Sequence, residues 1–470
     1  MVALSPGWWK QARDILGDRV VSDPTVTESY GHDESAPDEY RRVPEAVARP
    51  RDQHETAALL RLCGREKVSV TVRGAGTGLA AGSVPAPGGI VLSTELMNRV
   101  LDADPDNHTI TAQAGLPLRS LYEEVQRLGL YFPPHPGDEG ASLGGAVATN
   151  AGGARAVKYG TVRRFVLGLQ VVLASGEVLE LGGKYIKSST GYHLADLLIG
   201  SEGTLGVITA ITLSLLPPVG SVQTLLAPFE TVEAAIGAVP RVLQVGTIPC
   251  AVEFVEHSVI ALSERLLNKT WPAHRGTASL MLILDGRDEQ DTLGQAEAVG
   301  AALESAGALE VLLNDQRERQ AEMLEIRSML YEALKPGTSE GFDICVPRSQ
   351  IAPHVRFVHG LEQRLGTAIP TYGHAADGNV HSHSLRRVLR DGAFAEEIPG
   401  WKDQEAVIRG ALYEDVVSRG GVISGEHGIG LMKKDFLSMN LGPAQVSVMR
   451  AIKRALDPDG ILNPGKIFDV

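Results

Sequence analysis

Cysteine is scarce in this sequence, and its scarcity excludes two kinds of architecture. The chain of 470 residues has three cysteines, Cys63, Cys250 and Cys345, and no two of them form a Cys-x-x-Cys pair. Cysteines spaced so far apart build neither a disulfide framework nor an iron–sulfur cluster. We therefore expect three buried, reduced thiols.

Basic residues and long apolar runs are also in short supply. Lys and Arg number 44 against 57 Asp and Glu, for a net charge of -13. No basic run interleaves with aromatic residues, so we expect no nucleic-acid partner. No apolar run approaches the length of a membrane span, and the opening residues MVALSPGWWK lack the regions of a signal peptide. These absences predict a protein without a transmembrane segment, located in the cytoplasm.

The length and the order of the sequence patterns predict two domains. At 470 residues the chain exceeds what one hydrophobic core usually serves. An apolar strand stopped by Pro217 and Pro218 marks the boundary. Amphipathic helices are expected before it at 53–64 and 116–128, and beyond it helices at 231–243, 258–267 and 292–305 alternate with strands at 251–255 and 279–284. This alternation is typical of an α+β sandwich, a sheet with helices on one face.

What the sequence does have is glycine, gathered into three stretches in its first half. They read RGAGTGLAAGSVP from Arg73 to Pro85, PGDEGASLGGAVATNAGGA from Pro136 to Ala154, and GSEGTLGVIT from Gly200 to Thr209. A backbone without Cβ atoms can press its N–H groups against an anion and tolerates positive φ, so such loops wrap phosphorylated cofactors. Together the stretches predict a large dinucleotide ligand.

The spacing within these stretches argues against a Rossmann fold. The glycines of the first stretch are wrongly spaced for that fingerprint, and Pro85 and Pro87 fall where its helix would continue. In the second stretch, Ser142 is instead placed to cap a helix that begins at Leu143 and whose first free amides can face a pyrophosphate. The glycines and alanines that follow keep this surface low and leave room for a flat ring.

The three stretches together resemble the flavin-binding domain of the vanillyl-alcohol oxidase family, and within it the D-2-hydroxyacid dehydrogenase branch. The similarity runs from about Pro44 to the C-terminus and ends in DPDGILNPGKIF, Asp457 to Phe468. It implies an α+β fold with a two-subdomain FAD-binding domain at 1–217 and an α+β (ferredoxin-like) cap domain at 218–415. A C-terminal segment at 416–470 is expected to return to the FAD domain.

The resemblance also assigns residues that bind FAD. They are Arg73, Gly74, Ala75, Gly76, Thr77, Gly78, Leu79, Ser83, Pro136, Gly137, Asp138, Ser142, Gly144, Gly145, Ala148, Thr149, Gly152, Gly153, Ala154, Glu202, Gly203, Gly206, Val207, Ile208 and Asn463. In covalent members of the family a His occupies the position that matches Thr77. Because this chain has Thr there, we expect FAD to be bound without a covalent link.

A second informative region, TYGHAADGNVHSHS at 371–384, carries three histidines. Its Asp-Gly dipeptide between extended runs is typical of a two-residue hairpin turn, and a turn centred there places His374 directly opposite His381. Directly opposed residues have Cβ atoms roughly 4.5–5.5 Å apart, close enough for both imidazoles to bind one metal. Tyr372 and His383 are expected on the same face because side chains alternate along a strand.

The stretch SGEHGIG at 424–430 supplies a third candidate ligand. Its neighbouring carboxylate and imidazole are bracketed by glycines that let the backbone turn, which can aim Glu426 at a metal and His427 at a substrate. With His374 and His381, this set leaves a coordination position open, as catalytic sites do. Mixed nitrogen and carboxylate ligands do not select among Zn2+, Mn2+ and Fe2+, so the identity of the metal stays open. The stretch also resembles the Glu-His-Gly-x-Gly signature of the branch.

The substrate site is assigned by the resemblance as well. It implies that Arg327 holds the substrate carboxylate, with Tyr331 and His383 as further substrate residues, and Arg327 lies on a helix expected at 320–334. Gly341 falls near the position where hydroxyglutarate dehydrogenases place a substrate lysine, which favours a smaller 2-hydroxy acid. The other arginines on or just before this helix are Arg317 and Arg319.

These parts predict an FAD-dependent dehydrogenase that oxidises a D-2-hydroxy acid of the lactate or glycolate type to the 2-oxo acid. Hydride passes to FAD, the divalent metal acidifies the hydroxyl group, and His427 is the base. A quinone, a cytochrome and an electron-transferring flavoprotein stay open as the electron acceptor, as do a homodimer and peripheral attachment at the inner membrane. A non-catalytic electron-relay subunit would leave the metal ligands without a role, and a metal-dependent hydrolase would leave the glycine stretches without one.

Overall fold

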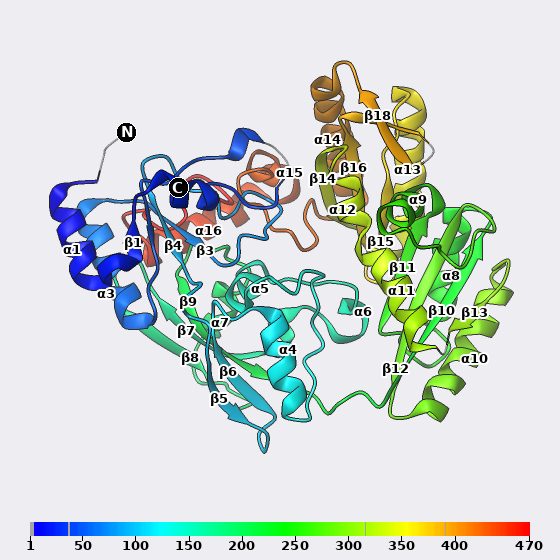
Figure 1. The fold of residues 1–470 in the computed structure, drawn as a ribbon, viewed down its shortest axis with the longest axis horizontal. Helices are drawn as coiled ribbons and strands as arrows, with labels where there is room; N and C mark the ends of the chain where they lie inside the picture. The colour runs from blue at the N-terminus through cyan, green and yellow to red at the C-terminus, as the bar shows by residue number, and fades with distance from the viewer. Residues whose placement is uncertain (1–3, 36–37, 315, 391) are drawn as a thin grey trace. The chain divides into compact units, whose positions relative to one another are not determined.

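The computed structural model describes residues 4–35, 38–314, 316–390 and 392–470. The chain divides into two compact units, whose elements are labelled in Figure 1. Unit 1 comprises Met1–Gly152, Thr161–Pro218 and Glu426–Val470, and unit 2 comprises Gly153–Gly160 and Val219–Gly425. The chain therefore enters unit 2 twice and ends in unit 1.

Unit 1 contains two sheets. The smaller has the order β1-β2-β4-β3, in which β2, β4 and β3 are parallel. Its strands are β1 (Val20–Val21), β2 (Ala46–Ala48), β3 (Val70–Arg73) and β4 (Ile90–Ser93). The larger is antiparallel with the order β5-β6-β9-β7-β8. Its strands are β5 (Val100–Asp104), β6 (Thr109–Gln113), β7 (Val166–Val172), β8 (Val178–Gly182) and β9 (Val207–Ser214).

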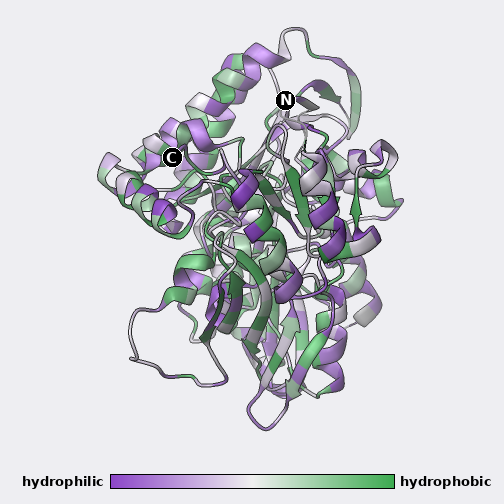
Figure 2. Cartoon of the chain, turned by 90° about the vertical axis from the view of Figure 1, so that its left-hand side faces the viewer, coloured by the Kyte–Doolittle hydropathy of each residue, from purple (hydrophilic) through white to green (hydrophobic). Residues whose placement is uncertain are grey.

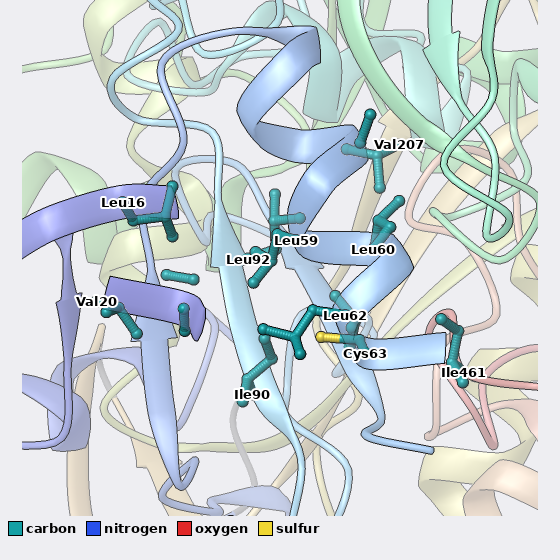
Figure 3. Close-up of a cluster of buried hydrophobic side chains, with 14 of the residues drawn as sticks. Leu16, Val20, Leu59, Leu60, Leu62, Cys63, Ile90, Leu92, Val207 and Ile461 are labelled. Carbon is teal, nitrogen blue, oxygen red and sulfur yellow. The ribbon is translucent and has the colours of Figure 1, made fainter. Parts of the chain in front are cut away.

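The core of the smaller sheet is built around α3 (Gln53–Glu66), which confirms the helix expected at 53–64. Asp52 caps this helix by accepting the N–H groups of His54 and Glu55 at 2.9 Å. Buried side chains of α3 pack with Val207 of β9 and with Ile461, as Figure 3 shows. Residues far apart in the sequence thus share one core, and the C-terminal part of the chain lies against β3.

The remaining helices of unit 1 follow local sequence signals. Ser142 caps α5 as expected, since its Oγ accepts the N–H of Gly145 at 3.2 Å. The helix expected at 116–128 forms with Pro117 as its N-cap. The helices are α1 (Pro6–Leu16), α2 (Pro24–Thr27), α4 (Leu118–Arg127), α5 (Leu143–Thr149), α7 (Leu194–Leu198), α15 (Leu437–Asn440) and α16 (Pro443–Leu456).

Unit 2 is built on a seven-stranded antiparallel sheet with the order β13-β10-β12-β11-β15-β16-β14. Its strands are β10 (Ser221–Phe229), β11 (Ala251–Glu256), β12 (Ala278–Gly286), β13 (Leu312–Asn314), β14 (Thr338–Cys345), β15 (Thr371–His374) and β16 (Asn379–Leu385). A separate hairpin consists of β17 (Arg387–Arg390) and β18 (Ala393–Glu397). The alternation of helices and strands expected beyond Pro218 is confirmed.

The helices of unit 2 include those expected at 231–243, 258–267 and 292–305, together with others that were not predicted. The helices are α6 (Ala156–Tyr159), α8 (Val232–Val242), α9 (His257–Leu267), α10 (Glu289–Ser305), α11 (Arg317–Ser328), α12 (Leu330–Leu334), α13 (Ile351–Leu365) and α14 (Trp401–Ser418). The single helix expected at 320–334 is wrong, because the backbone leaves helical geometry at Met329 (φ -86, ψ 4) and separates α11 from α12.

The structure bears on two expectations from the composition, the state of the cysteines and the lack of a membrane span. The three cysteines are free, but only Cys63 and Cys250 are buried, and Cys345 is half-buried. Figure 2 shows hydrophilic and hydrophobic residues mixed along the helices, as in amphipathic surface helices. Within the described part of the chain, no helix combines the length and the apolar character needed to cross a membrane.

Candidate active site

Unit 1 contains a cavity of about 250 Å³ whose walls come from all three glycine stretches. The residues predicted to bind FAD that line it are Gly74, Ala75, Gly76, Thr77, Gly78, Leu79, Ser83, Pro136, Asp138, Ser142, Gly144, Gly145, Ala148, Thr149, Glu202, Gly203, Gly206, Ile208 and Asn463. The cavity is also lined by residues that were not predicted to bind FAD, namely Val72, Ala80, Gly82, Thr94, Ala114, Ala141, Ala146 and Ala151. Small residues of this kind also serve ordinary packing, so they carry little signal by themselves.

Other residues predicted to contact FAD lie outside the cavity lining. Arg73 is buried and donates from Nη1 to the carbonyl oxygen of His32 at 2.5 Å and to Ser83 Oγ at 3.3 Å, so it braces the first stretch. Val207 packs in the core around α3. The other predicted residues that do not line the cavity all come from the second stretch and are Gly137, Gly152, Gly153 and Ala154. The last two belong to unit 2, because the chain leaves unit 1 after Gly152.

Close backbone contacts explain why the cavity wall needs glycine. A Cβ added at Gly144 would lie 2.6 Å from Ala114 Cβ and 2.8 Å from the Ala114 carbonyl oxygen. Gly76 has φ +80, and a Cβ there would lie 2.0 Å from Arg73 Nη2. At both positions, a side chain would push neighbouring atoms apart and change the shape of the wall.

The loop that follows Gly425 is anchored in unit 1 by Glu202. The Glu202 carboxylate accepts the N–H of Ile429 at 2.7 Å and the N–H of Gly430 at 2.8 Å. Burial raises the pKa of Glu202, and these two N–H groups act in the opposite direction. The anchoring holds the preceding residues, Glu426 and His427, at the wall of the cavity.

In unit 2 the histidine-rich hairpin forms in a register that differs from the predicted one. Tyr372 lies opposite His381, and His374 lies opposite Asn379, so the prediction that His374 directly faces His381 is wrong. The connection between the strands spans 375–378 rather than two residues, which shifts the pairing by two positions. Because a two-residue shift keeps each side chain on its face, His374 and His381 remain diagonal neighbours with ring centroids 5.4 Å apart.

A buried carboxylate that sequence reasoning missed, Glu253 of β11, lies beside these histidines. Its Oε1 is 2.6 Å from His374 Nδ1, and its Oε2 accepts a hydrogen bond from Arg327 Nη2. Burial acts to raise the pKa of Glu253, but the charges of Arg327 and His374 outweigh it and lower the pKa to about 2. Glu253 is therefore a carboxylate anion at neutral pH. A single Glu inside the apolar strand AVEFVE was the signal that could have identified it.

Arg327 is held on two sides and keeps a donor available. Its guanidinium Cζ lies 5.0 Å from the ring centroid of Tyr372, and one Nη is bonded to Glu253. Its Nε is buried and has no hydrogen-bond partner within the described residues. A buried N–H without a partner is costly, so this side of the guanidinium suits an anionic ligand.

The diagonal histidines offer ligands for a metal ion. A ring nitrogen of His374 and one of His381 lie within 4.8 Å of each other. Asp343, another residue that sequence reasoning missed, has Oδ1 3.9 Å from His381 Nδ1, and its Oδ2 accepts the N–H of Gly425 at 3.0 Å. Glu426 follows Gly425 directly in the sequence. Two imidazoles with a carboxylate nearby form a donor set that fits a divalent metal.

The other predicted substrate residues gather around Tyr372. His383 Nε2 is 3.3 Å from Tyr372 Oη, and the His383 ring lies 6.1 Å from that of Tyr331. Gly341 lies opposite His383 in the sheet, and a Cβ at Gly341 would be 3.6 Å from the His383 ring. In unit 2 the structure therefore brings Arg327, Tyr331 and His383 to one region.

The comparisons with known proteins agree with this geometry. Residues 220–467 match the family described as FAD linked oxidases, C-terminal domain, and residues 44–182 match the FAD binding domain family. The chain belongs to the FAD-linked oxidase family. This FAD-linked oxidoreductase is 41% identical to D-lactate dehydrogenase of Archaeoglobus fulgidus, over 94% of this chain and 96% of that protein. It is 37% identical to D-lactate dehydrogenase of Anaerostipes hadrus (99% and 98% covered) and 34% identical to glycolate oxidase subunit GlcD of Bacillus subtilis (93% and 92% covered).

Solved structures show the fold. The 4-ethylphenol oxidase from Gulosibacter chungangensis matches with a TM-score of 0.80 at 18% identity, over 100% of this chain and 99% of that one. The p-cresol methylhydroxylase matches with a TM-score of 0.79 at 18% identity, over 99% of this chain and 98% of that one. The predicted fold, an FAD-binding domain of the vanillyl-alcohol oxidase type followed by a cap domain, is confirmed, as is the predicted family.

The cavity of unit 1 fits the FAD that the family implies. Its glycine walls leave backbone groups accessible, and Asn463 adds an unused acceptor. Asn463 Nδ2 donates to the Glu202 carbonyl oxygen at 2.5 Å, while its Oδ1 is buried and has no partner within the described residues. A buried orphan acceptor in a cavity wall indicates that a ligand donor completes it.

Proposed function

We propose that this protein oxidises a small D-2-hydroxy acid to the 2-oxo acid. The observation that carries the proposal is Arg327, whose guanidinium is fixed by Glu253 and Tyr372 and whose buried Nε lacks a partner within the described residues. A substrate carboxylate would satisfy this donor. Relatives that are similar over almost the whole chain are named for D-lactate and glycolate, which are both 2-hydroxy acids.

Each residue then has a defined task. Arg327 binds and orients the substrate carboxylate, while His374, His381 and Glu426 hold a Zn2+, Mn2+ or Fe2+ ion. When bound, that ion supplies a Lewis acid that lowers the pKa of the 2-hydroxyl group. His427 accepts the hydroxyl proton on its imidazole nitrogen. FAD, when bound in the cavity of unit 1, supplies the acceptor for the hydride that leaves C2.

The size of the substrate follows from Gly341. This position lies opposite His383 and carries no side chain, so it offers no charge for a second substrate carboxylate. We therefore propose lactate or glycolate rather than 2-hydroxyglutarate. Anaerobic mixing of the purified protein with each acid tests this choice. Flavin bleaching should be faster with D-lactate or glycolate than with D-2-hydroxyglutarate, and the reverse order would contradict the proposed substrate size.

The flavin is proposed to be noncovalent. Thr77 lines the cavity at the position where covalent relatives carry His, and its hydroxyl cannot replace that imidazole. Acid precipitation should leave a colourless pellet and a yellow supernatant. Yellow colour that stays with the precipitated protein would contradict the proposal.

A further inference from the structure

Glu253 contacts both His374 and Arg327, and it is a charged residue within the otherwise apolar part of β11. The residue lies in the middle of β11, where it is 1% exposed. Burying a carboxylate is costly unless strong partners compensate for its lost hydration. Both of its oxygens have such a partner, and the two partners differ: His374 at Oε1 and Arg327 at Oε2.

Each contact fixes the group that it touches. At His374 the carboxylate accepts the N–H of Nδ1, which leaves the lone pair of Nε2 for a metal ion. At Arg327 it occupies one Nη and keeps the guanidinium over the ring of Tyr372. Antiparallel pairing sets the first contact, because β11 pairs with β15 so that Glu253 lies opposite His374.

We propose that Glu253 is a positioning residue that couples the metal ligand His374 to the carboxylate-binding Arg327. This inference rests on the proposed function, since it assumes that His374 binds a metal and that Arg327 binds a substrate anion. One carboxylate sets the tautomer of the histidine and the direction of the guanidinium together. A shift of Glu253 therefore disturbs both ends of the substrate site.

The chemistry of the two contacts demands a carboxylate rather than any polar group. The amide of a Gln side chain offers one acceptor oxygen and one NH2 group that can only donate, whereas the Glu carboxylate offers two acceptor oxygens. If the amino group faces His374, Nδ1 must accept, and the proton moves to the Nε2 that should bind metal. If the amino group faces Arg327, two donors meet and the guanidinium is displaced. Gln can preserve one contact but not both.

The test uses Glu253→Gln in the full-length, FAD-containing protein. Mn2+ affinity is measured by electron paramagnetic resonance titration of metal-free protein. Propionate, which has the carboxylate but no 2-hydroxyl, is titrated by calorimetry to report on Arg327 alone. Because Gln can keep only one of the two contacts, we expect the affinity for Mn2+ or the affinity for propionate to fall. The expected loss is about 10- to 100-fold, the range seen when a hydrogen-bond partner of a metal ligand is replaced. FAD content should stay at the wild-type level.

Two further variants separate positioning from a general structural role. Glu253→Asp keeps the charge and should restore part of the lost affinity. Glu256→Gln removes the carboxylate of another Glu–His contact on the same strand, 3.2 Å from His359 Nε2, and should leave Mn2+ and propionate binding unchanged. If Glu253→Gln fails to fold, Glu253→Asp replaces it in the test. The shorter Asp side chain cannot contact both His374 and Arg327, so the affinity for Mn2+ or for propionate should still fall.

The outcomes distinguish this inference from the proposed function. Wild-type affinity for both Mn2+ and propionate in Glu253→Gln and Glu253→Asp would overturn the coupling role. An equal loss of binding in Glu256→Gln would also overturn it, because the effect would then be general. A wild-type protein that takes up no Mn2+ contradicts the metal site of the proposed function, and the coupling role fails with it.

Discussion

The cavity of unit 1 and the side-chain cluster of unit 2, formed by Glu253, Arg327, His374 and His381, are suited to their ligands in different ways. The cavity wall consists mainly of Gly, Ala, Ser and Thr, so its shape and its backbone N–H groups define what enters. The cluster consists of charged and titratable side chains, with Glu253 buried between Arg327 and His374. The cavity depends on the absence of side chains, and the cluster depends on the identity of each one.

This difference predicts opposite sensitivities to substitution. Adding a methyl group should damage the cavity even where no charge changes, because the wall is closely packed. In the cluster, a replacement of nearly equal volume should be damaging whenever it changes donors, acceptors or charge. An added methyl group in the cavity should therefore impair FAD binding alone, and a change of charge or hydrogen bonding around Glu253 should impair the site in unit 2 alone.

The largest effect on activity is expected from Gly144→Ala, because a protein that has lost its FAD cannot oxidise substrate at all. The new Cβ would meet backbone and side-chain atoms of Ala114 at 2.6–2.8 Å, and overpacking of this kind costs roughly 1–3 kcal/mol. We expect the purified protein to lose most of its FAD, measured as the ratio of flavin to protein absorbance, and to unfold at a lower temperature. Gly64→Ala is the matched control, because a Cβ there meets only ordinary contacts at 3.9 Å or more. Full flavin content in Gly144→Ala would show that the wall is not tightly packed.

The next largest effect is expected from His427→Asn. If His427 accepts the hydroxyl proton, removing the base should slow substrate-driven flavin reduction by about 10²–10⁴-fold, measured by anaerobic stopped flow. FAD and metal content should stay at wild-type levels. Loss of the metal in this variant would instead assign His427 as a ligand, and a wild-type rate would exclude both roles.

A smaller effect is expected from Arg327→Lys. Lysine keeps the charge but cannot hold Glu253 and a substrate carboxylate through one planar fork. The dissociation constant for D-lactate should rise about tenfold to a hundredfold, the range for loss of a charged hydrogen bond, while the flavin spectrum is unchanged. Arg319→Lys, an exposed position on the same helix, should have no effect. Equal constants for Arg327→Lys and wild type would show that Arg327 does not bind substrate.

Local signals in the sequence predicted local structure well. Ser142 before a run of small residues predicted the capped start of α5, because a cap depends on residues that are neighbours in the sequence. The glycine stretches predicted the cavity, because their residues form most of its wall. The hairpin at 371–384 was harder. Its Asp-Gly dipeptide indicated a turn but did not determine the loop length, so the register was wrong while the shared face was right. The face was right because strand side chains repeat every two residues.

What the sequence could not provide is the pairing of distant residues. Glu253 meets His374 because β11 pairs with β15, and it meets Arg327, which lies in the last turn of α11. No periodicity within AVEFVE indicates either partner. The domain boundaries at 217 and 415, and the roles of His374, His381, Glu426 and His427, stay predictions.

The most direct test of the proposed reaction is an anaerobic titration of the yellow, purified protein with D-lactate, followed in the flavin absorbance bands. A 2-hydroxyacid dehydrogenase whose substrate carboxylate is held by Arg327 should be bleached by D-lactate with formation of an equal amount of pyruvate, and should not be bleached by L-lactate or by propionate. A flavin that stays oxidised with D-lactate and with glycolate would contradict the proposed reaction.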